Sequence, residues 1–308
     1  MKYKDWLNEW LEHYVKPTTK IRTYERYREL SIHINKKIGE YEINTLSPII
    51  LQRFITELLI NGNLKTGKEL SPNTVNAVIS IIQNSLKTAF AIGLIDTYSA
   101  DKIKRPNMTE KAIECFSISE QKSIETAVLN NKKPKLIGVI ICLYTGLRIG
   151  ELLALEWSDI DFSKGLISVS KSCHYGRNNN GEYVRFLDTP KTNHSVRIIP
   201  IPKRLIPLLK NHKKACTSEY VISYNGRAVA VRSYQRSFEL FQKKLNIPRR
   251  GFHALRHTFA TRAIECGMDV KTLSEILGHK NSTITLNRYA HSLLEHKIEM
   301  MNRIGKLL

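Results

Sequence analysis

Apolar residues in the first hundred positions recur at the spacing of amphipathic helices. Trp6, Trp10 and Tyr14 lie on one stripe together with neighbouring leucines. Such aromatic stripes are more often core than platforms for stacked bases, so we expect this one to be buried. A second helix is expected over about residues 18–34.

Two serine–proline pairs mark further helix starts in the same third of the chain. Ser47 with Pro48, and Ser71 with Pro72, each place serine at the N-cap and proline in the first turn. The helix after Pro72 is long and is expected to end at Gly93, because glycine adopts the left-handed conformation that ends many helices. Four helices joined by polar loops predict a small bundle.

A linker is expected where the hydrophobic period stops. Residues 101–112 show no periodicity. We therefore place a helical domain at 1–104, a linker at 105–114 and a second domain at 115–308.

The second domain begins with helices and then changes period. Ser117 and Glu120 predict a capping box, and apolar helices follow over about 135–144 and 147–156. Alternating positions then predict three strands, over residues 165–170, 182–187 and 194–200. A polar loop is expected at 176–181, and toward the C-terminus the pattern is helical again. The predicted fold class is mainly α with a small antiparallel β-sheet in the second domain.

Composition limits the class of protein. Hydrophobic residues make up 42% and charged residues 25% of the 308 positions, which is typical of a folded globular protein. No apolar run is long enough to span a membrane, and the N-terminus lacks the pattern of a secretory signal. The five cysteines are scattered without a CxxC pair, so we expect reduced thiols and a cytoplasmic protein.

The chain is strongly basic. A net charge of +20 and an isoelectric point near 9.7 predict a polyanionic partner, above all nucleic acid. Charge alone does not decide this, since ribosomal proteins and some membrane-surface proteins are also basic. Residues that could act on a phosphodiester are therefore more informative.

Arg148 is a candidate phosphate ligand. Cutting a phosphodiester requires neutralisation of its non-bridging oxygens, and a guanidinium donates two hydrogen bonds while it stays charged. Arg148 is expected in the first turn of a helix, where backbone amides also favour an anion. The alternative is an ion pair with Glu151, three residues further on, on a solvated helix face.

His253 and Arg256 are three positions apart, so one helix face carries both. Arg256 is a candidate second phosphate ligand and His253 a candidate acid or base, and a plain surface pair is the alternative. Metal binding by His253 and His257 is disfavoured, because Ala254 stands where a zinc protease needs glutamate.

Lys191, His279 and Tyr289 complete the candidates. Lys191 lies between predicted strands, where a lysine is usually solvated but where its ammonium could protonate a leaving oxygen. His279 follows Gly278 at a predicted helix end, and Tyr289 comes ten residues later. Tyr289 is a nucleophile only if cations and a base activate its hydroxyl, and is otherwise a half-buried amphipathic residue.

Three blocks of sequence carry a family resemblance. They are TGLRIGEL at 145–152, HALRHTFAT at 253–261, and LGH at 277–279 followed by Tyr289. In order and spacing they resemble the signature boxes of tyrosine recombinases, the phage integrase family. The resemblance covers about residues 115–292, and the N-terminal bundle resembles the family's core-binding domain more loosely. It implies a two-domain clamp on double-stranded DNA.

The resemblance implies a catalytic set that comprises Arg148, Lys191, His253, Arg256, His279 and the nucleophile Tyr289. In the family, the two arginines hold the scissile phosphate, the lysine protonates the 5′-hydroxyl leaving group, the first histidine assists proton transfer and the second hydrogen-bonds the phosphate. Tyr289 would attack and leave a 3′-phosphotyrosine, and Glu151 would orient the site from behind. Since the phosphotyrosine conserves bond energy, no metal, ATP or other cofactor is implied.

Several functions remain open within the resemblance. The long segment 170–189 resembles the sheet insertion of mobile-element integrases, which favours an integrase that acts as a homo-tetramer through a Holliday junction on inverted-repeat core sites. An excision or host architectural factor would be a further partner. Xer-like resolution of chromosome or plasmid dimers, topoisomerase-like relaxation and, from another class, a non-cutting DNA-binding regulator are the alternatives.

The two ends of the sequence carry further expectations. Many mobile-element integrases have an additional N-terminal arm-binding domain, whereas this sequence begins almost at the core-binding helices. We expect either a relative that lacks this domain or a truncated chain. Residues 292–308 are expected to form a tail helix that closes its own domain or docks on a neighbouring subunit.

Overall fold

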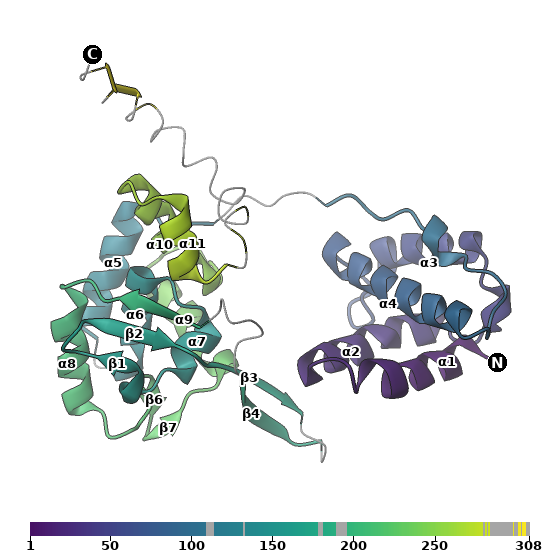
Figure 1. Cartoon of the computed structure of the whole chain (residues 1–308), viewed down its shortest axis with the longest axis horizontal. Coiled ribbons are helices and arrows are strands. Elements are labelled where there is room, and N and C mark those ends of the chain that lie inside the picture. Colours follow the sequence, from purple (N-terminus) through teal and green to yellow (C-terminus); the bar gives the residue numbers. More distant parts are fainter. Residues whose placement is uncertain are drawn as a thin grey trace. The chain divides into compact units, whose positions relative to one another are not determined.

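The computed structural model describes residues 1–108, 114–131, 133–177, 181–188 and 196–279, and the single positions 281, 283, 298, 301, 302, 304 and 305. The chain divides into two compact units, Met1–Lys111 and Ala112–Leu308, each with its own hydrophobic core (Figure 1). Helices dominate both units and short antiparallel sheets lie in the second, as the sequence predicts.

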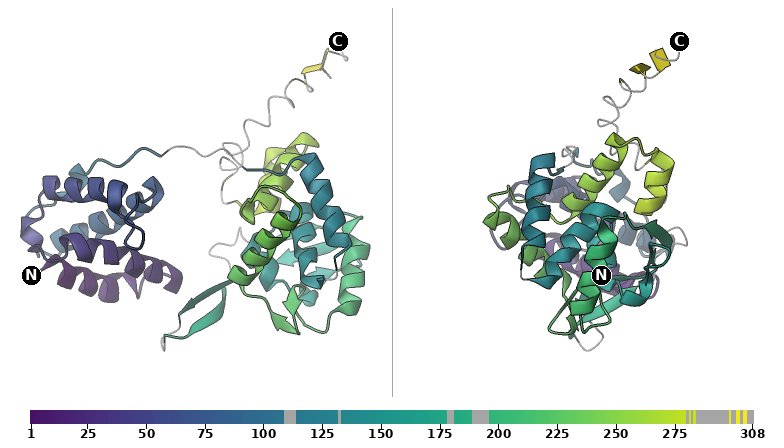
Figure 2. Two further views of the ribbon diagram at one scale, coloured as in Figure 1. Left: turned by 180° about the vertical axis from the view of Figure 1, so that it is seen from behind. Right: turned by 90° about the vertical axis from the view of Figure 1, so that its left-hand side faces the viewer.

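The first unit is a helical bundle, seen from behind in Figure 2. Its elements are α1 (Tyr3–Trp10), η1 (Leu11–Val15), α2 (Ile21–Ile38), η2 (Ile43–Thr45), α3 (Pro48–Asn61), α4 (Pro72–Ala91) and η3 (Ala100–Lys102). At the start of α4, the Ser71 side chain accepts a hydrogen bond from the Thr74 amide, as predicted. Ser47 occupies the N-cap of α3 without such a bond.

Contacts between α1 and α4 fix the bundle. The Tyr3 hydroxyl lies 2.8 Å from the Ser85 hydroxyl, and Trp6 Nε1 donates to the Ser85 carbonyl at 3.0 Å. Trp6 and Trp10 are buried, which confirms the predicted core for both, whereas Tyr14 is exposed. The α2 helix is displaced toward the C-terminus relative to the expected 18–34, because the turn that follows η1 continues to Thr19.

The chain stays on the bundle beyond the last helix of the first unit. Ile103 is buried, and the Lys104 amide donates to the side chain of Gln52 at 2.9 Å. Arg105 Nη2 donates to Gln83 Oε1 at 2.6 Å. The part of the expected linker before residue 107 therefore has contacts of its own within the first unit.

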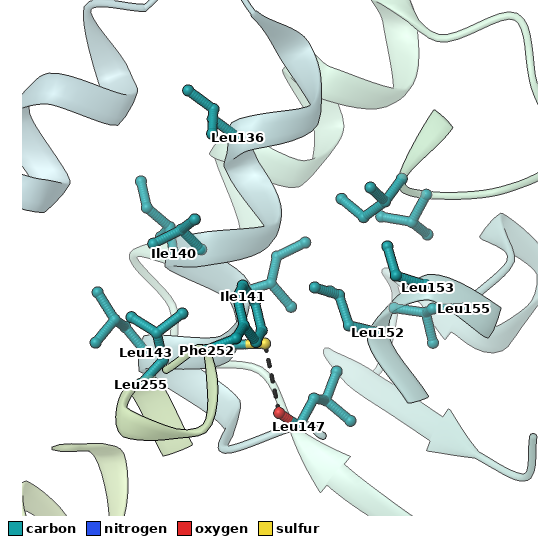
Figure 3. Packing of buried hydrophobic residues seen from close by; sticks show 14 of the residues in the cluster. Leu136, Ile140, Ile141, Leu143, Leu147, Leu152, Leu153, Leu155, Phe252 and Leu255 are labelled. Atoms are coloured by element: carbon teal, nitrogen blue, oxygen red, sulfur yellow. Dashed lines mark hydrogen bonds between the residues drawn. The ribbon is translucent and has the colours of Figure 1, made fainter. Parts of the chain in front are cut away.

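Helix α6 (Ile137–Thr145) is the centre of the second unit. It packs against α5 (Ile118–Leu129), α7 (Ile149–Ala154), α8 (Leu205–Ala215) and α10 (His253–Glu265). Figure 3 shows Ile141 from α6, Leu152 from α7 and Leu255 from α10 in one apolar cluster. The dashed line in that view is the bond from the Cys142 thiol to the Leu147 carbonyl, at 3.4 Å.

The described part of this unit also contains the helical elements η4 (Pro134–Leu136), η5 (Trp157–Asp159), α9 (Val231–Lys244) and α11 (Val270–Leu277). The capping box predicted for α5 is present, because the Ser117 hydroxyl accepts from the Glu120 amide and the Glu120 carboxylate from the Ser117 amide. Of the expected tail helix 292–308, the structure describes positions 298, 301, 302, 304 and 305, and each is helical.

The strands in the described part of the chain form three small antiparallel sheets. One has the order β1 (Ile160–Asp161), β2 (Leu166–Val169), β5 (Arg197–Pro200); the others pair β3 (Ser172–Arg177) with β4 (Tyr183–Asp188), and β6 (Ser223–Tyr224) with β7 (Arg227–Ala228). Strand β3 was not predicted, and the expected loop at 176–181 is wrong for Gly176 and Arg177, which lie in β3. The segment has no clear alternation of its own and is a strand because it pairs with β4.

All five cysteines are free thiols. Across the described ranges, the helices are too short or too polar to cross a membrane.

Candidate active site

The turn between α6 and α7 sets the position of Arg148. The α6 helix ends at Gly146 with a left-handed φ of 66°, and a Cβ there would lie 2.6 Å from the ring of Phe259 in α10, so only glycine fits. Leu147 then enters the core. Arg148 takes the N-cap position of α7 in an extended conformation, one step before the first turn in which it was expected.

Glu151 binds Arg148 at two points. The backbone N–H of Arg148 donates to Glu151 Oε2 at 2.8 Å, and Arg148 Nη1 donates to Oε1 at 2.8 Å. The ion pair considered as an alternative therefore exists, but Glu151 is only 7% exposed and does not lie on a solvated face. The pair consequently restrains the arginine at the edge of the core.

Arg197 in β5 is the second partner of Glu151. Its Nη1 donates to Oε1 at 3.1 Å and its Nη2 to Oε2 at 2.8 Å, the two-pronged geometry that suits a carboxylate. Burial raises the pKa of Glu151, but the hydrogen bonds and charge of Arg197, together with Arg148, outweigh burial and hold that pKa at about 2. Glu151 is therefore ionised at neutral pH.

Arg256 is buried in α10, with 2% of its surface exposed. Its Nη1 donates to the Gly146 carbonyl at 2.8 Å and its Nη2 to the Leu277 carbonyl at 2.7 Å. Nη2 also lies 2.9 Å from Nε2 of His279. Because arginine has no acceptor, His279 Nε2 must accept this bond, which leaves the proton of a neutral ring on Nδ1.

Three arginines meet at the C-terminal end of α11. Ile276 O accepts from Arg197 Nε at 2.6 Å, Leu277 O from Arg256 Nη2, and Gly278 O from Arg148 Nη2 at 3.1 Å. Carbonyl groups at the end of a helix lack the amide partners of the helix interior, and the helix dipole favours cations there. Gly278 is left-handed, with φ of 64°, and delivers His279 to the same place.

The structure brings four predicted residues together: Arg148, Glu151, Arg256 and His279. His253 begins α10 and is exposed, and its ring lies edge-to-face with His257 at 4.5 Å between centroids. Lys191 and Tyr289 lie outside the described residues. Within the described ranges, no group of three or more histidine, cysteine, aspartate or glutamate side chains could hold a metal ion.

Arg197 is the site residue to which sequence reasoning gave no role. In β5 the side chains alternate, so that Arg197 and Ile199 are buried while Ile198 is exposed. This alternation was the signal in the sequence for a role of Arg197, because an arginine on the inward face of a strand requires a buried acidic partner. The sequence predicts the strand at 194–200, but it was not recognised that Arg197 lies on the inward face of this strand.

The sequence is similar to two protein-family profiles and to several known proteins. The profile of the Phage integrase family matches residues 116–296, and that of the phage integrase N-terminal SAM-like domain matches residues 2–59. A protein named tyrosine recombinase XerC-like from Caldanaerobacter subterraneus subsp. tengcongensis is 30% identical over 98% of this chain and 81% of its own length. The ICEBs1 integrase of Bacillus subtilis is 28% identical over 92% of this chain and 78% of its own length.

A solved structure shares the fold. The Tn1549 transposon integrase in complex with a circular intermediate DNA aligns with a TM-score of 0.80, over 99% of this chain and 99% of that chain. The two sequences are 24% identical over the alignment, so this likeness concerns the fold.

Proposed function

The chain belongs to the phage integrase family, and we propose that it is a site-specific recombinase that cuts and rejoins double-stranded DNA through a 3′-phosphotyrosine. The observation that carries the proposal is the convergence of Arg148 and Arg256 on the end of α11, beside His279. Two restrained guanidinium groups at one place suit the two non-bridging oxygens of a phosphodiester.

Arg148 is the donor that an incoming phosphate would meet first. Its side chain is 37% exposed, although Glu151 holds Nη1 and the Gly278 carbonyl holds Nη2. Each of these nitrogens carries two N–H groups, so that one can stay on the protein while the other donates to phosphate oxygen. The arginine is therefore restrained before DNA arrives.

Phosphate binding would replace the hydrogen bond between Arg256 and His279. Nη2 of Arg256 donates to Nε2 of His279 in the free protein. A phosphate oxygen would replace Nε2 as the acceptor, and His279 would hydrogen-bond the same phosphate. The bonds from Arg256 to the Gly146 and Leu277 carbonyls would keep its guanidinium in place.

Tyr289 is the proposed nucleophile. Its hydroxyl oxygen attacks phosphorus, the bond between phosphorus and the 5′ oxygen breaks, and the 3′ end remains on the tyrosine. Lys191 gives a proton to the departing 5′ oxygen, and His253 assists proton transfer by accepting the proton that the Tyr289 hydroxyl loses. Rejoining reverses these steps with a 5′-hydroxyl as the nucleophile, so the exchange needs neither ATP nor a metal ion.

Integration and excision of a mobile genetic element is the proposed role, carried out in the cytoplasm. The β3–β4 hairpin enlarges the second unit at the segment expected for mobile-element integrases, and the relative named ICEBs1 integrase supports this role. The relative named XerC-like makes Xer-like dimer resolution the second candidate. We propose a homo-tetramer on inverted-repeat core sites, with an excision or host architectural factor as a further partner.

Covalent capture tests the proposal. Wild-type and Tyr289→Phe protein are incubated with fragmented DNA from the source, in EDTA and without nucleotide, and the protein-linked fragments are sequenced after denaturation. We expect adducts with wild-type protein alone, at a core flanked by inverted repeats. Adducts at two sites, one at each end of a single DNA segment, would support a mobile element. Adducts at a single chromosomal site would support Xer-like resolution.

Other outcomes would contradict it. An adduct formed by Tyr289→Phe would place the nucleophile elsewhere, and adducts without a shared sequence would favour a relaxing, topoisomerase-like activity. Specific DNA binding without any adduct would support a regulator that does not cut.

A further inference from the structure

We infer that Arg197 is a positioning residue for strand cleavage, which fixes Glu151 and the end of α11 and thereby holds Arg148 at the scissile phosphate. This inference rests on the proposed function, because it concerns the rate of the same cleavage step. Arg197 lies in none of the three sequence blocks on which the family resemblance is based.

The guanidinium of Arg197 faces the protein at all three nitrogens. Nη1 and Nη2 donate to the two oxygens of Glu151, at 3.1 and 2.8 Å, and Nε donates to the Ile276 carbonyl at 2.6 Å. Arg197 is 8% exposed, whereas the side chain of Arg148 is 37% exposed. Arg148 can therefore meet DNA directly, and Arg197 acts through the residues that it holds.

Arg197 links three segments that are far apart in the sequence: β5, α7 and the last turn of α11. Glu151 binds both the backbone amide and Nη1 of Arg148, which is the N-cap residue of α7. A displaced Glu151 carboxylate would therefore displace the backbone and the guanidinium of Arg148 together. The Ile276 carbonyl belongs to the same turn whose next two carbonyls bind Arg256 and Arg148. One side chain thus restrains both halves of the phosphate site.

The turn that leaves α11 also rests on Arg197. A Cβ added to Gly278 would lie 3.0 Å from Nη1 and 3.1 Å from Cδ of Arg197. The backbone of Gly278 therefore packs closely against this side chain at the point where the chain turns toward His279. Loss of the side chain would remove the surface that supports this turn.

Stability alone gives little reason for the buried pair. Desolvation of two charges offsets most of their attraction, and well-packed apolar residues in place of a buried ion pair are often as stable. The pair does, however, specify one direction for the Glu151 carboxylate, because a two-pronged arginine bond has a single good geometry. Orientation of Arg148 is therefore the property that the pair supplies.

The test measures cleavage and binding separately. A duplex of the captured core site is nicked so that the freed 5′ strand diffuses away, and adduct formation is timed at saturating protein. We expect Arg197→Met to slow adduct formation about 10²-fold, because small misplacements of catalytic groups have effects of this size, without a matching loss of DNA affinity. Arg197→Lys should recover part of the rate, because it keeps the charge but not the fork.

A double-mutant comparison distinguishes positioning from general damage. If Arg197 acts through Glu151, Arg197→Met combined with Glu151→Gln should cleave no more slowly than the slower single variant. Arg250→Met is the matched control, because it removes a partly buried ion pair with Glu120 in the same unit and should cleave at the wild-type rate. Thermal unfolding of every variant shows whether a lost rate follows from lost folded protein.

The outcomes separate this inference from the proposed function. If wild-type protein forms no adduct, the proposed function fails. If wild-type and Arg197→Met cleave equally fast, or if the effects of Arg197→Met and Glu151→Gln simply multiply, only the positioning role is overturned. Should Arg197→Met not fold, the same comparison with Arg197→Lys decides: a normal rate for this folded variant overturns the inference, and a slow rate with normal DNA affinity supports it.

Discussion

The two units of this chain bury different kinds of polar side chain. Among the described residues of the first unit, the buried side chains that carry polar groups are uncharged, and they include the hydroxyls of Tyr3, Ser31 and Ser85. The second unit buries charges as well, and they include Glu151, Arg197 and Arg256. All three lie at one place, where α7, β5 and α10 meet the end of α11.

This difference distinguishes buried groups that support the fold from buried groups that serve the site. A buried hydroxyl needs one or two hydrogen bonds, as Ser85 makes with Tyr3 and the Ile82 carbonyl. A buried charge costs several kcal/mol unless other groups compensate for it. We therefore expect substitutions at buried polar positions of the first unit to change stability, and those in the second unit to change the cleavage rate first.

The largest effect is expected from Arg256→Ala. It should slow adduct formation by about 10²–10³-fold, as for the loss of one donor to a developing anion, while DNA binding persists. The rate is measured on the nicked core site at saturating protein. Ser31→Ala is the control in the first unit, since it removes a partly buried hydrogen bond to the Tyr27 carbonyl, and it should cleave normally. Equal cleavage rates for Arg256→Ala and Ser31→Ala would contradict the distinction between the two units.

Acid should destabilise the second unit through Glu151. Its folded pKa of about 2 lies below the usual glutamate value of 4.5, so the stabilisation is complete above pH 4.5 and is lost as pH falls toward 2. Between pH 6 and pH 3, wild-type protein should lose about 2 kcal/mol more unfolding free energy than Glu151→Gln. Hydrogen exchange of α6 amides at the two pH values measures this difference.

The first unit supplies the control for acid. The hydrogen bonds from Lys2 and Lys4 lower the pKa of Glu40 to about 2, but this carboxylate is fully exposed. Solvent and salt screen such exposed pairs, so Glu40→Gln should follow wild-type protein over the same pH range. A large effect of Glu40→Gln would contradict the distinction between the two units.

Local signals in the sequence predicted the helix ends that position the site. The capping box of Ser117 and Glu120, the break at Gly146 and the helix end at Gly278 are all present. Each depends on a few neighbouring residues, and glycine has a conformational freedom that few other residues share. The convergence of Arg148, Glu151, Arg256 and His279 was expected from the family resemblance, because no local rule brings such distant positions together.

Long-range packing decided what the sequence did not predict. Arg197 lies in a predicted strand but was given no role, because its partners are forty-six positions before it and seventy-nine after it. The carbonyls that accept from the three arginines carry no signal in the side-chain sequence. Strand β3 depends on its partner β4 in the same way. The roles of Lys191 and Tyr289 stay predictions.

A smaller effect is expected from Ser85→Ala in the first unit. The Tyr3 hydroxyl is completely buried and would lose its partner, which should lower the free energy of unfolding by about 1–3 kcal/mol. Urea unfolding measures the loss, and the cleavage rate of bound protein should not change. Tyr3→Phe added to Ser85→Ala should restore most of the stability, since no buried donor is then left unpaired. A slower cleavage rate would show that this core also serves the site.

The smallest effect comes from a matched pair of glycines. Gly93 and Gly278 are both left-handed, with φ of 74° and 64°, so alanine at either should cost about 1 kcal/mol of stability. A Cβ at Gly93 meets no atom within 4 Å, whereas one at Gly278 meets Arg197. Gly278→Ala should therefore also slow adduct formation, by roughly tenfold, while Gly93→Ala leaves the rate unchanged. Equal rates would mean that the contact between Gly278 and Arg197 does not transmit position to the phosphate site.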